Sequence, residues 1–472
     1  MKPRVGLVPF SEPRTGVYDT RKDMVEQEVG RLTRVLGSSL DLVTTNPVRF
    51  KPDLLKTLAL LRGQGVESAI LHVPVFTAAN LVVMAARLLD IPVIVVGNTR
   101  PESHSTVGFL ASTGGLDQVG LKYEAVLAET ESTALVDRVS SFCAAASAVA
   151  RLRGRTLGLF GGRALGLTIA NVDPAEWIRL FGVDIEHVDQ GEIIRRATRI
   201  PEAMAQGHMT WLTRRVQKIE YNTSSLNDVT LRKQVKSYLA TREIGREMHL
   251  DFMSIECQTY LSDNFALQCL NCALNNDPYD ADGPKEPIVC SCEGDLDGAL
   301  TMQILKLVSG GSPVALLDVR YIGDDGLVTL TNCGSVPTWF ACRADTPETN
   351  LAQIHLVPHI FGKAGGASLQ FVCDSGPVTL ARLSRLGTSY RMVVAKGATM
   401  KMPREALNRT TWAFPHAFFG GKSDTATLLR SLRANHIHMV AGDYADALKQ
   451  FCGIVGLECE VIGEEGDCAK GK

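Results

Sequence analysis

Alternation between apolar runs and helical segments limits the folds open to this chain more than any other feature. In the first 150 residues, four runs have strand character: RVGLVPF, LDLVTT, ESAILHVPV and IPVIVVGN. The segments between them, residues 21–36, 52–62 and 78–89, have helical periodicity. Apolar strands separated by helices are typical of a parallel sheet covered on both faces. A long helical segment, about 131–152, closes the region, so we expect an α/β domain over residues 1–153.

The alternation starts again with RTLGLFGG, which predicts a strand that ends in glycines. Residues 173–182 predict a short helix with Asp173 as its N-cap and Gly182 as its stop. Further strands and helices continue to EPIVCSC and the helix after Asp297, so we expect a second α/β domain over residues 154–310. The glycines of GLFGGRALG do not have the G-x-G-x-x-G spacing, and the next helix begins late. A tight turn that faces some other polar ligand is therefore expected rather than a nicotinamide site.

The sequence pattern changes at about residue 312. Short strand-like runs punctuated by glycine follow one another, among them SPVALLDVRYI, LVTLTNCG, GPVTLARLS and SYRMVVAKG. This pattern predicts an antiparallel sheet or barrel. We expect a β-rich, barrel-like C-terminal domain over residues 311–472, in which helix, strand and helix patterns finish the chain.

Charge and apolar content exclude several classes of partner. The formal net charge is −2 and there is no long basic run, which argues against nucleic acid or an anionic membrane as the main partner. No apolar stretch reaches the roughly 18 residues of a membrane-spanning helix, and the N-terminal residues do not resemble a signal peptide. The 12 cysteines lie mostly within apolar patterns, which favours a reducing, cytoplasmic location.

Four of the cysteines could form a structural zinc site. Cys269, Cys272, Cys290 and Cys292 supply the right number of thiols. However, the first pair lies in a segment of helical character, 265–275, with no turn glycine between the thiols. We therefore expect buried free thiols and keep zinc as the alternative.

Polar residues follow the predicted strands at positions where ligands of parallel sheets collect. Glu293 comes directly after EPIVCSC, and Asp318 closes SPVALLD. His436 and His438 lie in ANHIHM, between a helix end and a strand start. Two carboxylates and an imidazole can hold a divalent cation that keeps open coordination positions.

Each of these residues also has a structural interpretation. Asp295 and Asp297 precede a helix, where acids cap free amides and interact favourably with the helix dipole. Asp318 could form an ion pair with Arg320, and a lone histidine is more often structural than a ligand. Spacing alone leaves the metal site and these alternatives open.

The order of the motifs resembles the L-fucose isomerase family, which includes enzymes acting on L-fucose and D-arabinose and is related in fold to L-arabinose isomerase. The resemblance rests on CEGDLDGALTMQILKL, ALLDVRY, LTNCG, TTWAFPHAF and RANHIHMVAGDY, and it covers nearly the whole chain. It implies an α/β fold class with two Rossmann-like α/β domains followed by a β-rich, barrel-like C-terminal domain. It also implies a homo-oligomer, typically a hexamer, in which the first domain closes the site of a neighbouring subunit.

The same resemblance implies the site residues. Glu293, Asp318 and His436 match the family's metal ligands, with Mn²⁺ or another divalent cation as the cofactor; the asparagine before His436 favours it over His438. Residues matched to the sugar pocket are Gln258, Asn435, Trp412, His416 and, by a looser match, Arg14. The segment HVPVFTAAN has no tryptophan where the family presents an aromatic platform, and Phe76 is the replacement.

The implied activity is metal-dependent aldose–ketose isomerisation of a free sugar, such as L-fucose or D-arabinose, through an enediolate. Glu293 and Asp318 would carry protons between C1 and C2 as general base and acid. One alternative is an isomerase of a different or modified sugar on the same scaffold, although no Lys and Arg cluster in the matched segments indicates a phosphate. The other is a non-catalytic sugar-binding or regulatory protein, which predicts loss of an acidic pair that this chain retains.

Overall fold

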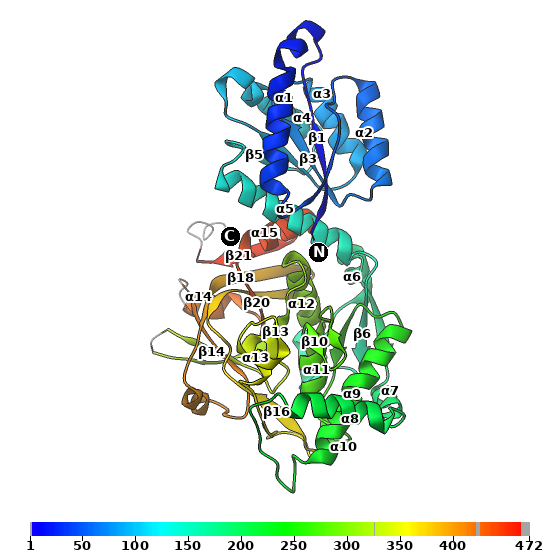
Figure 1. Ribbon diagram of the computed structural model, residues 1–472, viewed down its shortest axis with the longest axis vertical. Coiled ribbons are helices and arrows are strands. Elements are labelled where there is room, and N and C mark those ends of the chain that lie inside the picture. Colours follow the sequence, from blue (N-terminus) through cyan, green and yellow to red (C-terminus); the bar gives the residue numbers. More distant parts are fainter. Residues whose placement is uncertain (1, 325, 422–424, 464–472) are drawn as a thin grey trace. The chain divides into compact units, whose positions relative to one another are not determined.

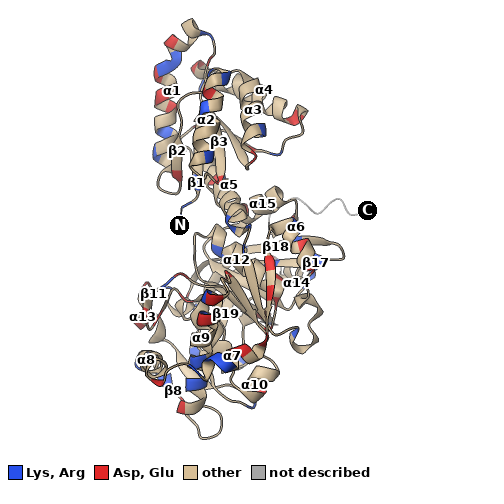
Figure 2. Cartoon of the chain, turned by 90° about the vertical axis from the view of Figure 1, so that its right-hand side faces the viewer, with Lys and Arg blue, Asp and Glu red and all other residues tan. Residues whose placement is uncertain are grey.

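A computed structural model describes residues 2–324, 326–421 and 425–463 (Figure 1). The chain divides into two compact units, one formed by residues 1–151 with 446–456 and the other by residues 152–445 with 457–472. The domain boundary predicted at residue 310 stays a prediction, because the second unit holds residues on both sides of it. Positions of basic residues and of acidic residues are interspersed along the chain (Figure 2).

The first unit contains a parallel sheet with strand order β2-β1-β3-β4-β5, a doubly wound arrangement that confirms the α/β prediction. Its strands are β1 (Arg4–Pro9), β2 (Asp41–Thr44), β3 (Ser68–Val73), β4 (Val93–Gly97) and β5 (Glu124–Leu127). Its helices are α1 (Thr15–Leu36), α2 (Lys51–Gly63), α3 (Ala79–Leu89), α4 (Ser105–Gln118), α5 (Thr133–Leu152) and α15 (Ala445–Val455).

Alternate residues of these strands enter two separate cores, which explains why the runs are apolar throughout. Val8 and Leu71 pack with α2, α3 and α4, whereas Leu7 and Ile70 pack with α1 and α5 on the other face. The C-terminal helix α15 belongs to this second core through Ile454. Gln450 of α15 also donates a hydrogen bond to the Glu124 carboxylate at 2.8 Å.

A buried histidine makes the first unit sensitive to acid. His72 on β3 is 1% exposed, and neither ring nitrogen has a hydrogen-bond partner in the described part of the chain. Burial lowers the pKa of His72 to about 4, so the folded state holds it neutral while the unfolded chain, with a pKa of 6.5, takes up a proton first. The stability that neutral His72 contributes is present above pH 6.5 and is lost as the pH falls toward 4.

We predict that the free energy of unfolding of the first unit falls by on the order of 3 kcal/mol between these pH values. The replacement His72→Leu should remove this dependence. Hydrogen exchange of residues 68–73 at both pH values measures the effect. The control is His104→Asn, which changes an exposed histidine of the same unit and should keep the wild-type dependence.

The second unit begins with a smaller parallel sheet of order β12-β9-β6-β7. Its strands are β6 (Thr156–Phe160), β7 (Asp184–Val188), β9 (Phe252–Ile255) and β12 (Cys290–Cys292). Its helices are α6 (Pro174–Phe181), α7 (Gln190–Ala197), α8 (Glu202–Thr213), α9 (Asp228–Glu247), α10 (Tyr260–Asn264), α11 (Cys269–Asn276) and α12 (Leu296–Val308). The α6 prediction is confirmed: the Asp173 side chain accepts from the Ala175 amide, and Gly182 ends the helix with φ 67°.

The glycine-rich turn after β6 faces a carboxylate of its own unit. The Glu256 side chain accepts a hydrogen bond from the Gly162 amide at 2.6 Å. A Cβ on Gly161, which has φ +97°, would lie 2.6 Å from the same Glu256 oxygen. Glycine is required at this close approach.

Among the described residues, six antiparallel strands close into a barrel, which confirms the predicted barrel-like C-terminal region. The order is β17-β20-β13-β14-β19-β18, and β18 pairs with β17 to close the ring, while β21 adds to β18 in parallel. The strands are β13 (Val314–Ile322), β14 (Val328–Thr331), β17 (Gly376–Leu386), β18 (Ser389–Met400), β19 (His416–Gly421), β20 (His436–Ala441) and β21 (Glu458–Ile462).

Smaller elements complete the second unit. A three-stranded sheet pairs β15 with β16 and β8, which joins segments far apart in the sequence. The remaining elements are β8 (Lys218–Ile219), β10 (Tyr279–Asp280), β11 (Gly283–Pro284), β15 (His355–Pro358), β16 (Ala367–Gln370), α13 (Pro347–Leu351) and α14 (Thr425–Ser431).

Helix α12 connects the parallel sheet to the barrel. It packs against β9 and β12 on one side and against β13, β17 and β20 on the other. Nearly every one of its residues is buried, including the four polar side chains of the otherwise apolar sequence LDGALTMQILKLV. The N-terminus of this helix therefore lies where the sheet edge meets the barrel strands. Across the described parts of the chain, no helix is both long enough and apolar enough to cross a membrane.

Candidate metal and sugar site

Glu293 lies in a sharp turn between β12 and α12. Both Glu293 (φ 63°) and Gly294 (φ 64°) have left-handed backbone conformations. A Cβ on Gly294 would lie 2.4 Å from the Gly162 carbonyl oxygen, so the turn needs glycine there. A non-glycine residue in this conformation is strained, and such strain concentrates at functional sites.

Asp318 and His436 reach the same place from the barrel. They are directly opposite each other in the antiparallel pair of β13 and β20, so their side chains project from the same face. His436 Nε2 lies 3.3 Å from Glu293 Oε2 and 3.6 Å from Asp318 Oδ1. The structure thus brings the three predicted ligands together around one imidazole nitrogen.

A buried carboxylate contacts the other ring nitrogen of His436. His436 Nδ1 is 2.7 Å from Asp295 Oδ2, which leaves Nε2 directed at the other two carboxylates. Asp295 also accepts from the Gly298 amide at 2.9 Å and pairs with the Arg382 guanidinium. Asp295, His436 and Arg382 are at most 1% exposed. A carboxylate on the second nitrogen is the usual way in which a metal-binding histidine is oriented.

The electrostatics of the site fit a cation. Burial alone would lower the pKa of His436, but Asp295 and Glu293 outweigh it and raise the pKa to about 10. Burial raises the pKa of Asp318, although the charge of His436 acts in the other direction. Burial would also raise the pKa of Asp295, but Arg382 and His436 hold it well below its usual range. The surrounding groups therefore favour a positive charge at the position of His436 Nε2.

The environment of one atom, His436 Nε2, shows whether these residues fit a metal. Among the described residues, His436 Nε2 is buried and has no hydrogen-bond partner, an arrangement that is costly unless something binds it. The oxygen and nitrogen donors around it suit a hard or borderline divalent cation. Glu293, Asp318 and His436 therefore fit the predicted metal. His438 lies on the same face of β20, where its Nε2 also has no partner.

The other predicted pocket residues occupy several places in the second unit. Gln258 follows β9, the strand paired with β12, and is half-buried. Asn435 Nδ2 donates to Asp318 Oδ1 at 3.0 Å. His416 has both nitrogens engaged, by Thr410 and by the Phe414 carbonyl, and burial lowers its pKa to about 4. Trp412 is 41% exposed.

Arg14 and Phe76 belong to the first unit and lie together there. The Arg14 guanidinium is 5.9 Å from the centre of the Phe76 ring. It also pairs with Glu12, whose carboxylate is 1% exposed. The side-chain hydrogen bond to Arg14 lowers the pKa of Glu12. Sequence reasoning selected the arginine and the phenylalanine separately but missed Glu12.

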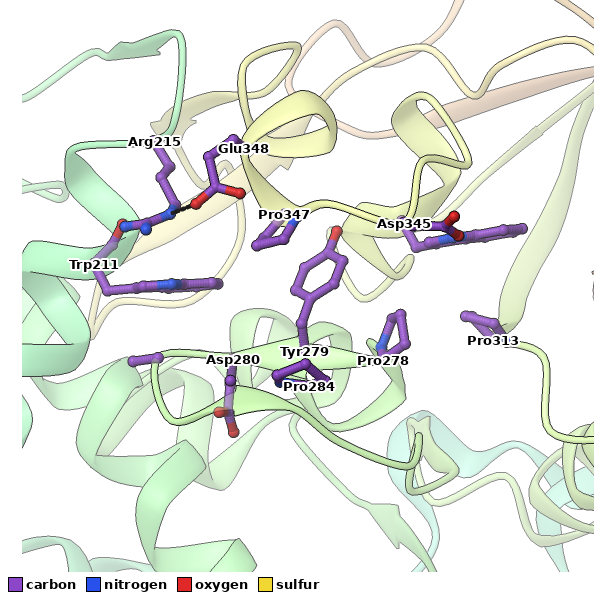
Figure 3. A pocket seen from close by; sticks show the side chains of 13 residues that line it. Trp211, Arg215, Pro278, Tyr279, Asp280, Pro284, Pro313, Asp345, Pro347 and Glu348 are labelled. Carbon is purple, nitrogen blue, oxygen red and sulfur yellow. Dashed lines mark hydrogen bonds and ion pairs between the residues drawn. The ribbon is translucent and has the colours of Figure 1, made fainter. Parts of the chain in front are cut away.

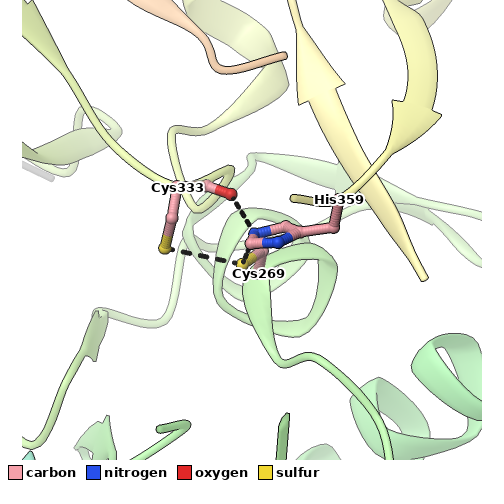
Figure 4. Close-up of side chains that lie close together, drawn as sticks. All are labelled: Cys269, Cys333 and His359. Carbon is pink, nitrogen blue, oxygen red and sulfur yellow. Dashed lines mark hydrogen bonds between the residues drawn. The ribbon is translucent and has the colours of Figure 1, made fainter. Parts of the chain in front are cut away.

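The cysteines occupy a different arrangement from the one that the zinc alternative requires. All four named thiols are buried and free of disulfides, as expected. Cys269 Sγ lies 3.6 Å from Cys333 Sγ and 3.5 Å from His359 Nε2 (Figure 4). However, His359 Nε2 donates to the Cys333 carbonyl oxygen at 2.7 Å, which commits it to a structural hydrogen bond.

Within the described ranges, three groups have all their potential ligand atoms within 4.8 Å of one another, and none is the predicted four-cysteine set. They are Cys269 with Cys333 and His359, Cys292 with Glu293 and Cys333, and His208 with Asp280 and Asp282. A cavity of about 440 Å³ lies elsewhere in this unit, where Trp211 and Tyr279 line it (Figure 3), and Trp339 is a further lining residue. None of the predicted site residues lines it.

Two supporting residues were not assigned from the sequence. Asp295 was interpreted as a helix cap, which it is, but its contacts with His436 and Arg382 were missed. Arg382 stands within the apolar run VTLARLS, and an arginine is rarely buried without a partner. That exception to the strand pattern is the signal that could have identified it.

Comparison with known proteins finds similarity to sugar isomerases. Residues 330–462 match the model of the L-fucose isomerase C-terminal domain. A sulfoquinovose isomerase of Alkalicoccus urumqiensis is 24% identical over 84% of this chain and 85% of its own length. A sulfoquinovose isomerase of Priestia aryabhattai is 22% identical over 85% and 86%. An L-fucose isomerase of Escherichia coli (strain 55989 / EAEC) is 23% identical over 64% and 63%. The C-terminal region of the chain therefore matches the L-fucose isomerase family, and most of the chain is similar to sugar isomerases.

Proposed function

We propose that this protein is a metal-dependent aldose–ketose isomerase with Glu293, Asp318 and His436 as the metal ligands. One observation carries the proposal: an unpartnered, buried imidazole nitrogen faces two carboxylates while a third carboxylate fixes the ring. A divalent cation such as Mn²⁺, when bound there, supplies a Lewis acid that polarises neighbouring sugar oxygens.

The protein's own groups perform the proton transfers. Isomerisation moves a proton between C1 and C2 through an enediolate, which requires a base and an acid within reach of these carbons. Glu293 and Asp318 come from different elements and flank the same point, and their side chains are 12% and 30% exposed. Burial raises the pKa of Asp318, which suits it to hold and return a proton. Asn435 keeps the Asp318 carboxylate in place.

The relatives favour a sugar that carries an anionic group as the first substrate to test. Those that match most of this chain are named for sulfoquinovose, a sulfonated sugar. Arg320 interrupts β13 in a bulge two residues after Asp318, and bulges beside active sites redirect side chains. We infer that Arg320 pairs with the sulfonate. L-Fucose and D-arabinose remain the second candidates, because L-fucose isomerases match a smaller share of the chain.

A substrate panel with the variant Arg320→Gln separates these substrates. With Mn²⁺ present, ketose formation is measured from sulfoquinovose, L-fucose and D-arabinose. The variant should raise KM for sulfoquinovose by about tenfold or more, because a charge-assisted contact is lost. The KM for L-fucose serves as the internal control and should not change. Equal effects on both sugars would contradict the role given to Arg320.

Metal removal tests the proposed activity itself. Dialysis against a chelator should abolish ketose formation, and re-addition of Mn²⁺ should restore it, because the metal supplies the Lewis acid that stabilises the enediolate. The metal content before and after dialysis is measured by mass spectrometry. Undiminished turnover in protein shown to be free of metal would rule out the mechanism.

We further propose that the protein acts as a homo-oligomer, a hexamer by family resemblance. In this arrangement Arg14 and Phe76 of one subunit would contact the sugar bound by another. Sedimentation measures the assembly. Mixing inactive Arg14→Gln and Glu293→Gln proteins should restore part of the activity if the site is shared, and no recovery after verified subunit exchange would contradict it.

A further inference from the structure

A second polar pocket lies beside α12 and does not contain the predicted metal ligands. It has a volume of about 240 Å³. Its polar lining comes from β17, the first turn of α12, the segment before β20 and the segment after the glycine-rich turn: Ser384, Arg382, Arg385, Asp297, Arg433 and Thr168. Glu293, Asp318 and His436 are not among the lining residues, so this is a separate site.

Three buried polar atoms on side chains that line this pocket have no hydrogen-bond partner among the described residues. They are Arg382 Nε, Ser384 Oγ and Asp297 Oδ1, on side chains whose residues are 1%, 6% and 2% exposed. Buried polar atoms are almost always paired, and an unpaired one costs free energy. Three such atoms on side chains that line one pocket indicate a ligand that offers acceptors to the first two and a donor to the third.

The charges of the pocket favour an anion. The Arg382 guanidinium is already paired with Asp295, but Arg385 and Arg433 bring two further positive charges. Asp297 opposes them only in part: burial raises its pKa to about 7, although Arg382 acts in the other direction. Tyr390 hydrogen-bonds the Asp297 carboxyl and leaves Oδ1 free. Guanidinium groups are well suited to oxyanions with several acceptor oxygens.

The volume of the pocket and the Asp297 carboxyl indicate which kind of anion fits. The pocket is smaller than those that usually enclose drug-sized ligands, so it suits a small group. An acceptor such as Asp297 Oδ1 beside the arginines favours an oxyanion that carries its own proton. Phosphate carries one at neutral pH, and sulfate does not.

We propose that this pocket binds phosphate, either as the free inorganic ion or as the phosphate group of a small metabolite. The phosphate oxygens accept from Arg382, Arg385 and Ser384, Arg433 adds its charge, and the phosphate hydroxyl donates to Asp297. The site is distinct from the proposed sugar site and does not depend on its chemistry.

Calorimetric titration of the metal-loaded, full-length protein tests the proposal. Inorganic phosphate and sulfate are compared at equal ionic strength and about pH 8, where the Asp297 carboxyl is ionised and phosphate still carries a proton. Phosphate should bind about tenfold more tightly than sulfate, because only phosphate satisfies Asp297. The variant Asp297→Asn should lose this preference. Absence of phosphate binding at millimolar concentrations, or equal affinity for both ions, would overturn the proposal.

Two exposed arginines allow a test that does not risk the fold. Arg385→Gln and Arg433→Gln should each weaken phosphate binding by about tenfold. Arg409→Gln is the matched control, because it removes the same charge from an exposed residue outside the pocket. An equal loss in the control would show that phosphate responds only to net charge and would overturn the site.

A parallel titration with D-ribose 5-phosphate identifies the source of the phosphate. Tighter binding of the sugar phosphate than of the inorganic ion supports a metabolite as the ligand. Tighter binding of the inorganic ion supports free phosphate. In both cases the Arg385→Gln variant should show the same loss.

Discussion

Replacing Glu293 by glutamine is expected to lower the rate of ketose formation by about 10²- to 10⁴-fold, the usual contribution of a general acid or base. Glutamine keeps the size of the side chain but cannot accept the proton, and it is a weaker ligand for a hard cation. The measurement is kcat at saturating Mn²⁺, with the bound metal quantified in the same sample. A large loss of kcat at full metal occupancy would assign the proton-transfer role apart from the ligand role.

The control for this variant is Glu405→Gln, which makes the same chemical change at an exposed position in the segment before β19. It should retain the full rate. If Glu293→Gln also retains full turnover, Glu293 does not carry the proton.

The replacement Asp295→Asn should produce the largest loss of stability, about 3–5 kcal/mol in the free energy of unfolding of the second unit. Asparagine can still cap α12, but it leaves the Arg382 guanidinium buried without its countercharge. Urea unfolding followed by tryptophan fluorescence reports this unit alone, since Trp177, Trp211, Trp339 and Trp412 all lie in it.

A double variant distinguishes the lost ion pair from general damage. Adding Arg382→Met removes the unpaired charge and should recover part of the stability. His436 would still lack its carboxylate, so the double variant should bind Mn²⁺ more weakly than the wild type even where it regains stability. An unchanged urea midpoint in Asp295→Asn would contradict the role given to the pair.

Much of the fold follows from local patterns. Runs such as ESAILHVPV are apolar at every position because alternate residues enter two cores, and this indicates a sheet covered on both faces. The α6 helix carries its own boundaries in Asp173, Pro174 and Gly182. The barrel follows from short strands separated by glycine. These features are encoded within a few residues of one another.

The candidate site follows from local patterns only in part. Glu293 and Asp318 attract notice because each ends a strand, but their approach to His436 depends on barrel closure and on the register of β13 with β20. Arg382 and Asp295 are 87 residues apart, and no periodicity connects them. Long-range ion pairs of this kind have no local signature, so Asp295 could be predicted only as a cap.

Because α15 packs in the first unit, it determines which fragments of this protein can fold. A fragment that stops at residue 153 would expose the apolar surface that Ile454 covers and would leave the Glu124 carboxylate without its hydrogen bond from Gln450. Such a fragment should aggregate when expressed alone. A shortened chain in which a flexible linker joins residue 152 to residue 445 restores the covering helix and is the better starting point for isolating this half of the molecule.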